Sequence, residues 1–184
     1  HENEIAQTCS LTGKPMAKYW LHNGFITINK EKMSKSLGNF FLLRDILEKF
    51  EPQTVRFYLL SVHYRSPLDF DDEKLEVAQK GLERLKNAYT ALNNGLRMTS
   101  AEADPAARQT LLAEVKQTEA AFQEAMDDDF NTALAIASLF DLAKAVNTYL
   151  KQAKLDAEAL QAAAAAFDRL LQVIGLDFAA KPEA

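Results

Sequence analysis

The chain has 184 residues, of which 48% are hydrophobic and 26% are charged, which is ordinary for a globular protein with a substantial core. It contains no apolar run near the roughly 20 residues that span a bilayer, and no signal-peptide pattern opens it, so we expect no membrane association. A single cysteine, Cys9, excludes an internal disulfide framework. One free cysteine is typical of a reducing compartment, and we expect a cytoplasmic protein.

The net charge of −5 is unevenly distributed along the chain. Residues 1–98 carry 14 Lys and Arg against 12 Asp and Glu, whereas residues 99–184 carry 7 against 14. An acidic second half argues against broad wrapping of nucleic acid there, so contacts with polyanions are expected in the first half. The chain begins with a histidine and a dense polar run, and we expect it to be a segment of a longer protein.

The first 28 residues predict one helix and two short strands. Residues 1–7 are good helix formers without a breaker. Residues 18–22 and 24–28 are aromatic and β-branched, which favours short strands or a bent hairpin. Trp20 is expected in the core, and His22 is either a substrate contact or a structural histidine.

A histidine and two glutamates near the start could ligate a metal, because residues three or four apart share a helix face. The ligands are too few for a closed tetrahedral zinc site, and a polar helix start explains them better. The aspartates at 127–129 are likewise better explained as capping and solvated residues than as a metal site.

The most distinctive segment is basic: Lys32-Met33-Ser34-Lys35-Ser36. Two ammonium groups three residues apart, with hydroxyls beside them, suit the oxygens of a polyphosphate. A solvated basic turn is the alternative for an arbitrary sequence of this composition. The segment is expected to follow a strand and to precede a helix at 40–50, a setting that can hold a mobile loop over a ligand.

The remainder is predicted to be mainly helical. Pro52 marks a helix start whose inward face includes Val55, Leu59 and Val62. His63 and Arg65 follow this helix, where they either hydrogen-bond its last carbonyls or face nucleic acid. A brief extended segment is expected at 68–70.

From residue 71 the apolar residues alternate at spacings of three and four. Asp71, Asp104, the aspartates at 127–129 and Asp156 are expected to open four helices, and Gly175 to end the last one. Four amphipathic helices with short connections predict an antiparallel four-helix bundle.

The basic segment and the stretches around it resemble a known protein family. The basic segment is identical to the KMSKS signature of class I aminoacyl-tRNA synthetases. Several such enzymes share it, so the flanks must distinguish them. The stretches that closely resemble cysteinyl-tRNA synthetases are 1–7, 19–25, 31–41, 55–57, 63–68 and 127–132.

The resemblance implies a division of the chain into residues 1–39, the end of a catalytic domain with the basic loop; 40–70, a stem-contact fold; 71–178, the helical bundle; and 179–184, a tail. It implies an ATP-dependent ligase in which Lys32 and Lys35 are catalytic. The ATP-binding residues would be Lys32, Met33, Ser34, Lys35 and Ser36. Candidate tRNA contacts are Arg44, Arg56, His63 and Arg65.

The resemblance also implies partners and cofactors. These are ATP with Mg²⁺, cysteine, tRNA(Cys) and a zinc ion in the full-length enzyme. Glu4 matches a zinc ligand of the family, whereas His1 and Cys9 match none. One ligand does not hold zinc, and no HIGH motif is present, so we expect this segment alone to be inactive. A monomer is expected.

Two alternatives stay open at this point. The chain could be a non-catalytic tRNA-binding module, or part of a related ligase that joins cysteine to an amino sugar. The stretches at 1–7 and 63–68 favour the tRNA enzyme.

Overall fold

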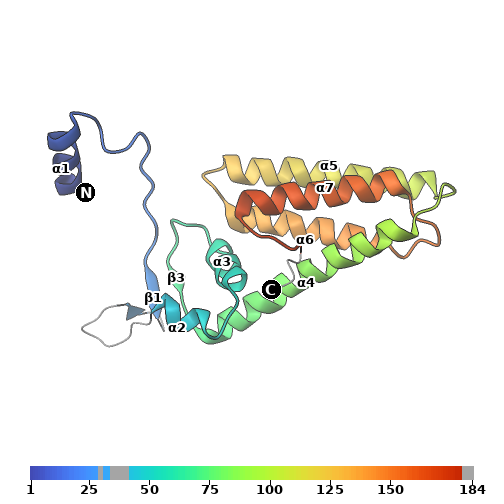
Figure 1. Ribbon diagram of the computed structural model, residues 1–184, viewed down its shortest axis with the longest axis horizontal. Coiled ribbons are helices and arrows are strands. Elements are labelled where there is room, and N and C mark those ends of the chain that lie inside the picture. The colour runs from blue at the N-terminus through green and yellow to red at the C-terminus, as the bar shows by residue number, and fades with distance from the viewer. Residues whose placement is uncertain (29–30, 34–41, 180–184) are drawn as a thin grey trace.

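The computed structural model describes residues 1–28, 31–33 and 42–179. Figure 1 shows mainly helices and a small sheet. The helices are α1 (Glu2–Thr12), α2 (Leu43–Leu47), α3 (Pro52–Leu60), α4 (Asp72–Gly95), α5 (Pro105–Asp127), α6 (Thr132–Tyr149) and α7 (Ala157–Ile174), with a 3-10 turn, η1 (Leu96–Met98), after α4. The strands are β1 (Ile26–Ile28), β2 (Glu31–Lys32) and β3 (Leu68–Asp69). The mainly helical class with short strands near the basic loop is confirmed.

The sheet has the strand order β2-β1-β3. β1 pairs antiparallel with β2 and parallel with β3, so residues 42 apart in sequence lie side by side. The strand expected at 18–22 is wrong: this segment is irregular and approaches β1 without a neighbouring strand in the described part of the chain. Residues that favour a strand form one only where a second strand pairs with them, and this segment has no such neighbour among the described residues.

The four long helices bury most of the core. Their apolar seams meet at fully buried residues such as Leu82, Leu92, Leu139 and Phe167. Among the long helices, α4 packs on α6 and α7, and α5 packs on α6 and α7 (Figure 1); α4 also packs on α3. α4 is thus not chiefly packed on α5, the next helix along the chain.

Close contacts establish the directions of these helices. The two ends of α4 meet α6 in the same order, Gly81 beside Phe140 and Gly95 beside Leu150, so α4 and α6 run parallel. Gly95 also lies beside Leu160, and Tyr89 donates a hydrogen bond to Asp168 at 2.7 Å, so α4 and α7 run antiparallel.

The predicted helix caps are confirmed at four positions. The side chains of Asp71, Asp104 and Asp156 accept hydrogen bonds from backbone N–H groups of the first turns of α4, α5 and α7. Gly175 ends α7 with a φ of 69°, in the left-handed region that glycine adopts without strain.

Three expectations are corrected. The aspartates at 127–129 do not open a helix: α5 continues through Asp127, and Asn131 is the N-cap of α6. Leu59 is 43% exposed, because α3 turns Thr54, Phe57 and Tyr58 inward beside Val55 instead. Trp20 is 42% exposed and contacts the rings of His1 and His22 rather than the core.

α1 stands apart from the other helices at the end of an extended segment (Figure 1). None of its residues is buried. Among the described residues, no helix is both long and apolar enough to cross a membrane.

Candidate active site

The basic loop begins at the end of β2. Lys32 is the last residue of this strand, and its backbone is in register with Thr27 of β1. Met33 follows and is half-buried. Ser34, Lys35 and Ser36 lie outside the described residues. The strand predicted at 24–28 is present as β1 (Ile26–Ile28), whereas β2, which includes the first lysine of the loop, was not predicted. The geometry of the loop itself stays a prediction.

The sheet that leads into the loop is held by β3. The Leu68 N–H donates to the Phe25 carbonyl at 2.9 Å, and the Phe70 N–H donates to the Thr27 carbonyl at 2.7 Å. The Thr27 hydroxyl donates to the Asp69 carboxylate at 2.9 Å. Backbone and side-chain bonds together align β1 on β3 and so direct the chain toward the loop.

β3 is in turn anchored to α3 and α4. The Tyr58 hydroxyl donates to the Asp69 carbonyl at 2.6 Å, and Lys74 lies 2.6 Å from the Asp69 carboxylate and 3.0 Å from that of Asp71. Burial raises the pKa of Tyr58, which keeps its hydroxyl a donor. Hydrogen bonds to Asp69 and Asp71 raise the pKa of Lys74, so this cation stays charged.

Gly24 brings the approach to β1 against the segment after α3. Its N–H donates to the Tyr64 carbonyl at 2.7 Å. A Cβ atom at this position would lie 2.2 Å from the Ser66 carbonyl oxygen, which is inside contact distance. The two backbones therefore pack as closely as they do because residue 24 has no side chain.

Asp129 also holds this segment, through side-chain contacts with residues 63–65. Its carboxylate accepts hydrogen bonds from the Tyr64 hydroxyl at 2.7 Å and from two nitrogens of Arg65, Nε and Nη2, the latter at 3.2 Å. The imidazole Nε2 of His63 lies 4.0 Å away. Hydrogen bonds from Arg65 and Tyr64 lower the pKa of Asp129 to about 2.

The backbone around Asp129 is unusual. Asp129 and Phe130 both have positive φ, 56° and 55°, a region that bulky residues rarely adopt. Neighbouring bonds hold this turn: the Asn131 side chain caps α6, and the Thr132 hydroxyl donates to the Leu60 carbonyl at the end of α3 at 2.7 Å. The α5–α6 junction is thus fastened to α3 and to residues 64–65 together. We call this the Asp129 junction.

A cavity of about 350 Å³ lies between these elements. Its lining includes Gly24, Ile26 of β1, Leu68 of β3, and Leu59 and Val62 at the end of α3. The cavity therefore borders β1, the strand that leads to the loop.

The structure does not gather the four candidate tRNA-binding residues into one site. Arg65, together with His63, faces Asp129 at the junction. The Arg56 guanidinium packs on Gly175 at the end of α7, and Arg44 is exposed on α2. Whether any of them contacts RNA stays a prediction.

Sequence reasoning missed the role of Asp129. The sequence feature that could have indicated it is the run of three aspartates at 127–129. The structure places this run at the C-terminal end of α5, where the helix dipole is negative and carboxylates are unfavourable. An unfavourable charge at a helix end indicates a partner elsewhere, but the partner at residues 64–65 is more than 60 residues away in sequence.

Glu4 is the one residue of the chain that the resemblance matches to a zinc ligand. Its carboxylate is exposed on α1 and lies 3.8 Å from the chain's amino group. Within residues 1–28, 31–33 and 42–179, no three His, Cys, Asp or Glu side chains are grouped so as to hold a metal ion. The described residues by themselves do not fit a zinc site.

Comparisons with known proteins agree with these observations. Residues 1–80 match the family described as tRNA synthetases class I (C) catalytic domain, and residues 121–179 match the DALR domain. A cysteine–tRNA ligase of Heliobacterium modesticaldum is 52% identical over 97% of this chain and 39% of its own length. One of Desulfitobacterium hafniense is 52% identical over 97% of this chain and 38% of its own length.

A solved structure shares the fold. The LeuRS of Agrobacterium radiobacter K84, crystallised in a ternary complex with tRNA and LeuAMS, matches 91% of this chain and 23% of its own with a TM-score of 0.72 at 20% identity. The chain spans about two fifths of the length of its curated relatives. With half of its residues identical to theirs across nearly its whole length, the chain belongs to the cysteine–tRNA ligase family of class I aminoacyl-tRNA synthetases.

Proposed function

We propose that this chain supplies the ATP loop and a tRNA-facing helical region of a cysteine–tRNA ligase. The observation that carries the proposal is the KMSKS sequence at the end of a strand paired with β1, in a chain half identical to such ligases. In the proposed reaction the cysteine carboxylate attacks the α-phosphorus of ATP and pyrophosphate leaves. A ribose hydroxyl of tRNA(Cys) then attacks the activated carbonyl and releases AMP.

Lys35 and Lys32 have the central role in the first step. Their ammonium groups would bind the β- and γ-phosphate oxygens as negative charge moves onto the departing pyrophosphate. Met33, Ser34 and Ser36 would place the loop backbone beside the nucleotide. Closure of the loop would exclude water and strengthen these interactions. Mg²⁺ is expected to accompany ATP.

We assign domains in keeping with this role. Residues 1–39 carry the loop, 40–70 form a stem-contact fold, 71–178 form a four-helix bundle with alternating helix directions, and 179–184 are a tail. Arg44 and Arg56 are the better candidates for RNA phosphates, because Asp129 engages Arg65 and lies near His63. Glu4 could contribute at most one zinc ligand, so no step is assigned to zinc. The ligase is proposed to be monomeric and cytoplasmic.

A chimera tests the function. The matching segment of the Heliobacterium modesticaldum ligase is replaced by this chain, and cysteine-dependent exchange of pyrophosphate into ATP is measured together with charging of tRNA(Cys). Retained activity in the chimera is expected. Lys35→Ala should reduce pyrophosphate exchange about 100- to 1,000-fold, the usual effect of losing one transition-state charge contact.

Controls keep the result interpretable. Lys116→Ala removes an exposed lysine on α5, far from the loop in sequence, and should leave exchange unchanged. This chain alone should show no exchange above background. Charging of an amino sugar but not of tRNA by the chimera would favour the related cysteine ligases instead. Exchange that is indifferent to Lys35 would overturn the assignment of the loop.

A further inference from the structure

A groove of about 450 Å³ lies between α5 and α6, and the proposed function does not use it. Its lining includes alanines at 107, 121 and 145, whose small side chains leave room between the two helices. Leu111 and Tyr149, which are both buried, add apolar surface. The volume is in the range of sites for small organic molecules. We call this site the α5–α6 groove.

One hydroxyl in the groove has no partner in the protein. The side chain of Thr118 on α5 is 4% exposed and lines the groove. Its hydroxyl forms no hydrogen bond with any residue that the structure describes, and it is not among the unpartnered side-chain atoms that are sealed from solvent. The hydroxyl therefore opens into the groove. Nearly buried polar groups usually have a partner, so this one indicates a bound molecule.

Three other hydroxyls of the lining are oriented by their own helices. Thr110, Ser138 and Thr148 each donate to a backbone carbonyl three or four residues earlier, at 2.9, 2.7 and 2.9 Å. Their protons are used in these bonds, so the oxygens offer a ligand only lone pairs. The hydroxyls of the groove thus favour a molecule that donates hydrogen bonds.

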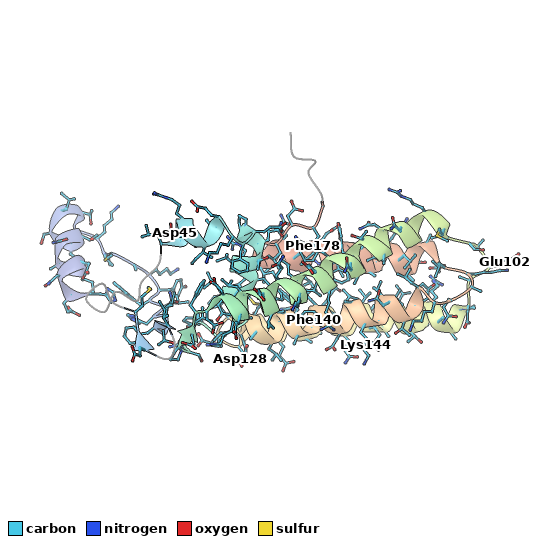
Figure 2. All side chains as sticks on the ribbon, turned by 90° about the horizontal axis from the view of Figure 1, so that it is seen from below. Asp45, Glu102, Asp128, Phe140, Lys144 and Phe178 are labelled. Atoms are coloured by element: carbon cyan, nitrogen blue, oxygen red, sulfur yellow. The ribbon has the colours of Figure 1, made fainter. Side chains whose placement is uncertain are left out.

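The charges of the groove have the same preference. Glu114 of α5 and Asp141 of α6 both line it, and neither forms an ion pair within the described part of the chain. Lys144 also lines it but is exposed and borders the neighbouring groove between α4 and α6. Figure 2 shows Lys144 on α6, between Asp128 at the α5–α6 turn and Glu102 at the other end of the long helices. Two carboxylates against one ammonium favour a cationic ligand.

The spacing of the two carboxylates suggests the length of that ligand. A short turn joins the end of α5 at Asp127 to the start of α6 at Thr132, so positions on both helices can be measured from it. Glu114 lies 13 residues before that end, and Asp141 lies 9 residues after that start. At about 1.5 Å per residue, the two are offset by about 6 Å along the groove. An extended four-carbon chain separates two terminal ammonium groups by a similar distance.

We propose that the α5–α6 groove binds a linear diamine or polyamine. Its ammonium groups, which stay charged at neutral pH, pair with Glu114 and Asp141 and donate to the hydroxyl oxygens beside them. Thr118 lies 9 residues before the end of α5, which is the level of Asp141, and accepts from the same ammonium. The methylene chain lies on the alanines and Leu111. This site is independent of the proposed ligase function.

The test follows the amide chemical shifts of the ¹⁵N-labelled chain during titration with 1,4-diaminobutane at neutral pH and about 150 mM KCl. Saturable shifts are expected within residues 107–121 and 138–152, with a Kd of about 1 mM or tighter. The double variant Glu114→Gln, Asp141→Asn should weaken binding at least about fivefold. The matched double variant Glu83→Gln, Asp45→Asn removes the same charges from exposed positions outside the groove and should change binding less than about twofold. Thermal melts establish that both variants are folded.

Two further measurements distinguish a built site from a merely acidic surface. Thr118→Val keeps the shape of the side chain and removes the hydroxyl, so binding should weaken about two- to fivefold. Its melting temperature should stay the same or rise, because the hydroxyl has no partner in the protein. 1-Aminobutane has one ammonium group on the same carbon chain and should bind at least about threefold more weakly than the diamine.

Four outcomes would overturn the proposal. These are shifts that do not saturate or that lie elsewhere on the chain, equal weakening by the two double variants, unchanged binding in Thr118→Val, and equal affinity for the two amines. None of them bears on the proposed function, because pyrophosphate exchange in the chimera is assigned to the basic loop. Failure of the chimera would likewise leave the diamine titration unaffected.

Discussion

The segment that leads to the ATP loop and the helices that follow it are built in different ways. Residues 1–28 contain no buried residue, and large apolar side chains such as Leu11, Tyr19 and Phe25 are exposed there. The long helices, by contrast, enclose fully buried leucines and a continuous core. The difference shows that the segment leading to the loop has no core of its own. Its strand β1 is held by bonds to residues 64–70, which the helices anchor.

The first prediction concerns the core of the long helices and has the largest expected effect on stability. Leu82 is 1% exposed in the core, so Leu82→Ala should lower the free energy of unfolding by about 2–5 kcal/mol through lost burial and a residual cavity. Leu11→Ala is the matched control, because Leu11 is 88% exposed, and should change it by less than about 0.5 kcal/mol. Urea denaturation measures both. Equal effects would contradict the comparison.

The second prediction concerns the close approach at Gly24. In Gly24→Ala the new Cβ meets the Ser66 carbonyl, so β1 must move away from β3 at a cost of about 1–3 kcal/mol. Amide hydrogen exchange at Leu68 and Phe70 should accelerate, since both donate to this stretch. Gly13→Ala is the control: nothing lies within 4 Å of its Cβ, so only left-handed strain at the end of α1 is expected. Unchanged amide hydrogen exchange at Leu68 and Phe70 in Gly24→Ala would contradict the prediction.

The third prediction concerns a helix cap. Asp156 accepts a hydrogen bond from the Ala159 N–H at 2.8 Å, and Asp156→Ala should lower the free energy of unfolding by about 1 kcal/mol. Asp156→Asn keeps an acceptor and should recover most of this loss. Thermal unfolding of the two variants separates the cap from the charge interaction with Arg108. If Asn were as harmful as Ala, the ion pair rather than the cap would explain the effect.

The fourth prediction is the smallest in global stability and the most local. Hydrogen bonds depress the pKa of Asp129 in the folded chain to about 2 from an ordinary value of 3.8. The junction's contribution to stability is therefore fully present above about pH 4 and is lost as the pH falls toward 2. Asp129→Asn should lose that part of the acid dependence and expose the amides of residues 64–66 to faster exchange at neutral pH.

Asp168→Asn provides a control for the Asp129 variant. It weakens the bond from Tyr89 on the far side of α4 and should not alter exchange at residues 64–66. The same acid profile in Asp129→Asn and the unaltered chain would show that the Asp129 junction does not carry the predicted linkage.

The family resemblance and the helical part were readable from sequence because their signals are local. The caps at Asp71, Asp104 and Asp156 and the stop at Gly175 depend on neighbours within one helical turn, and all four were predicted. The exposed Trp20 and the missing strand at 18–22 were not, because burial and pairing depend on which distant segments are nearby.

The basic loop and the periodicity of four helices follow from residue type and spacing, which act over a few positions along the chain. The parallel placement of α4 beside α6 and the Asp129 junction depend on residues brought together from far apart in sequence. Helix periodicity specifies that a face is buried and leaves open which helix covers it. Tertiary packing determines which helix covers that face. It also brings Asp129 to Tyr64 and Arg65, which lie more than 60 positions away in sequence.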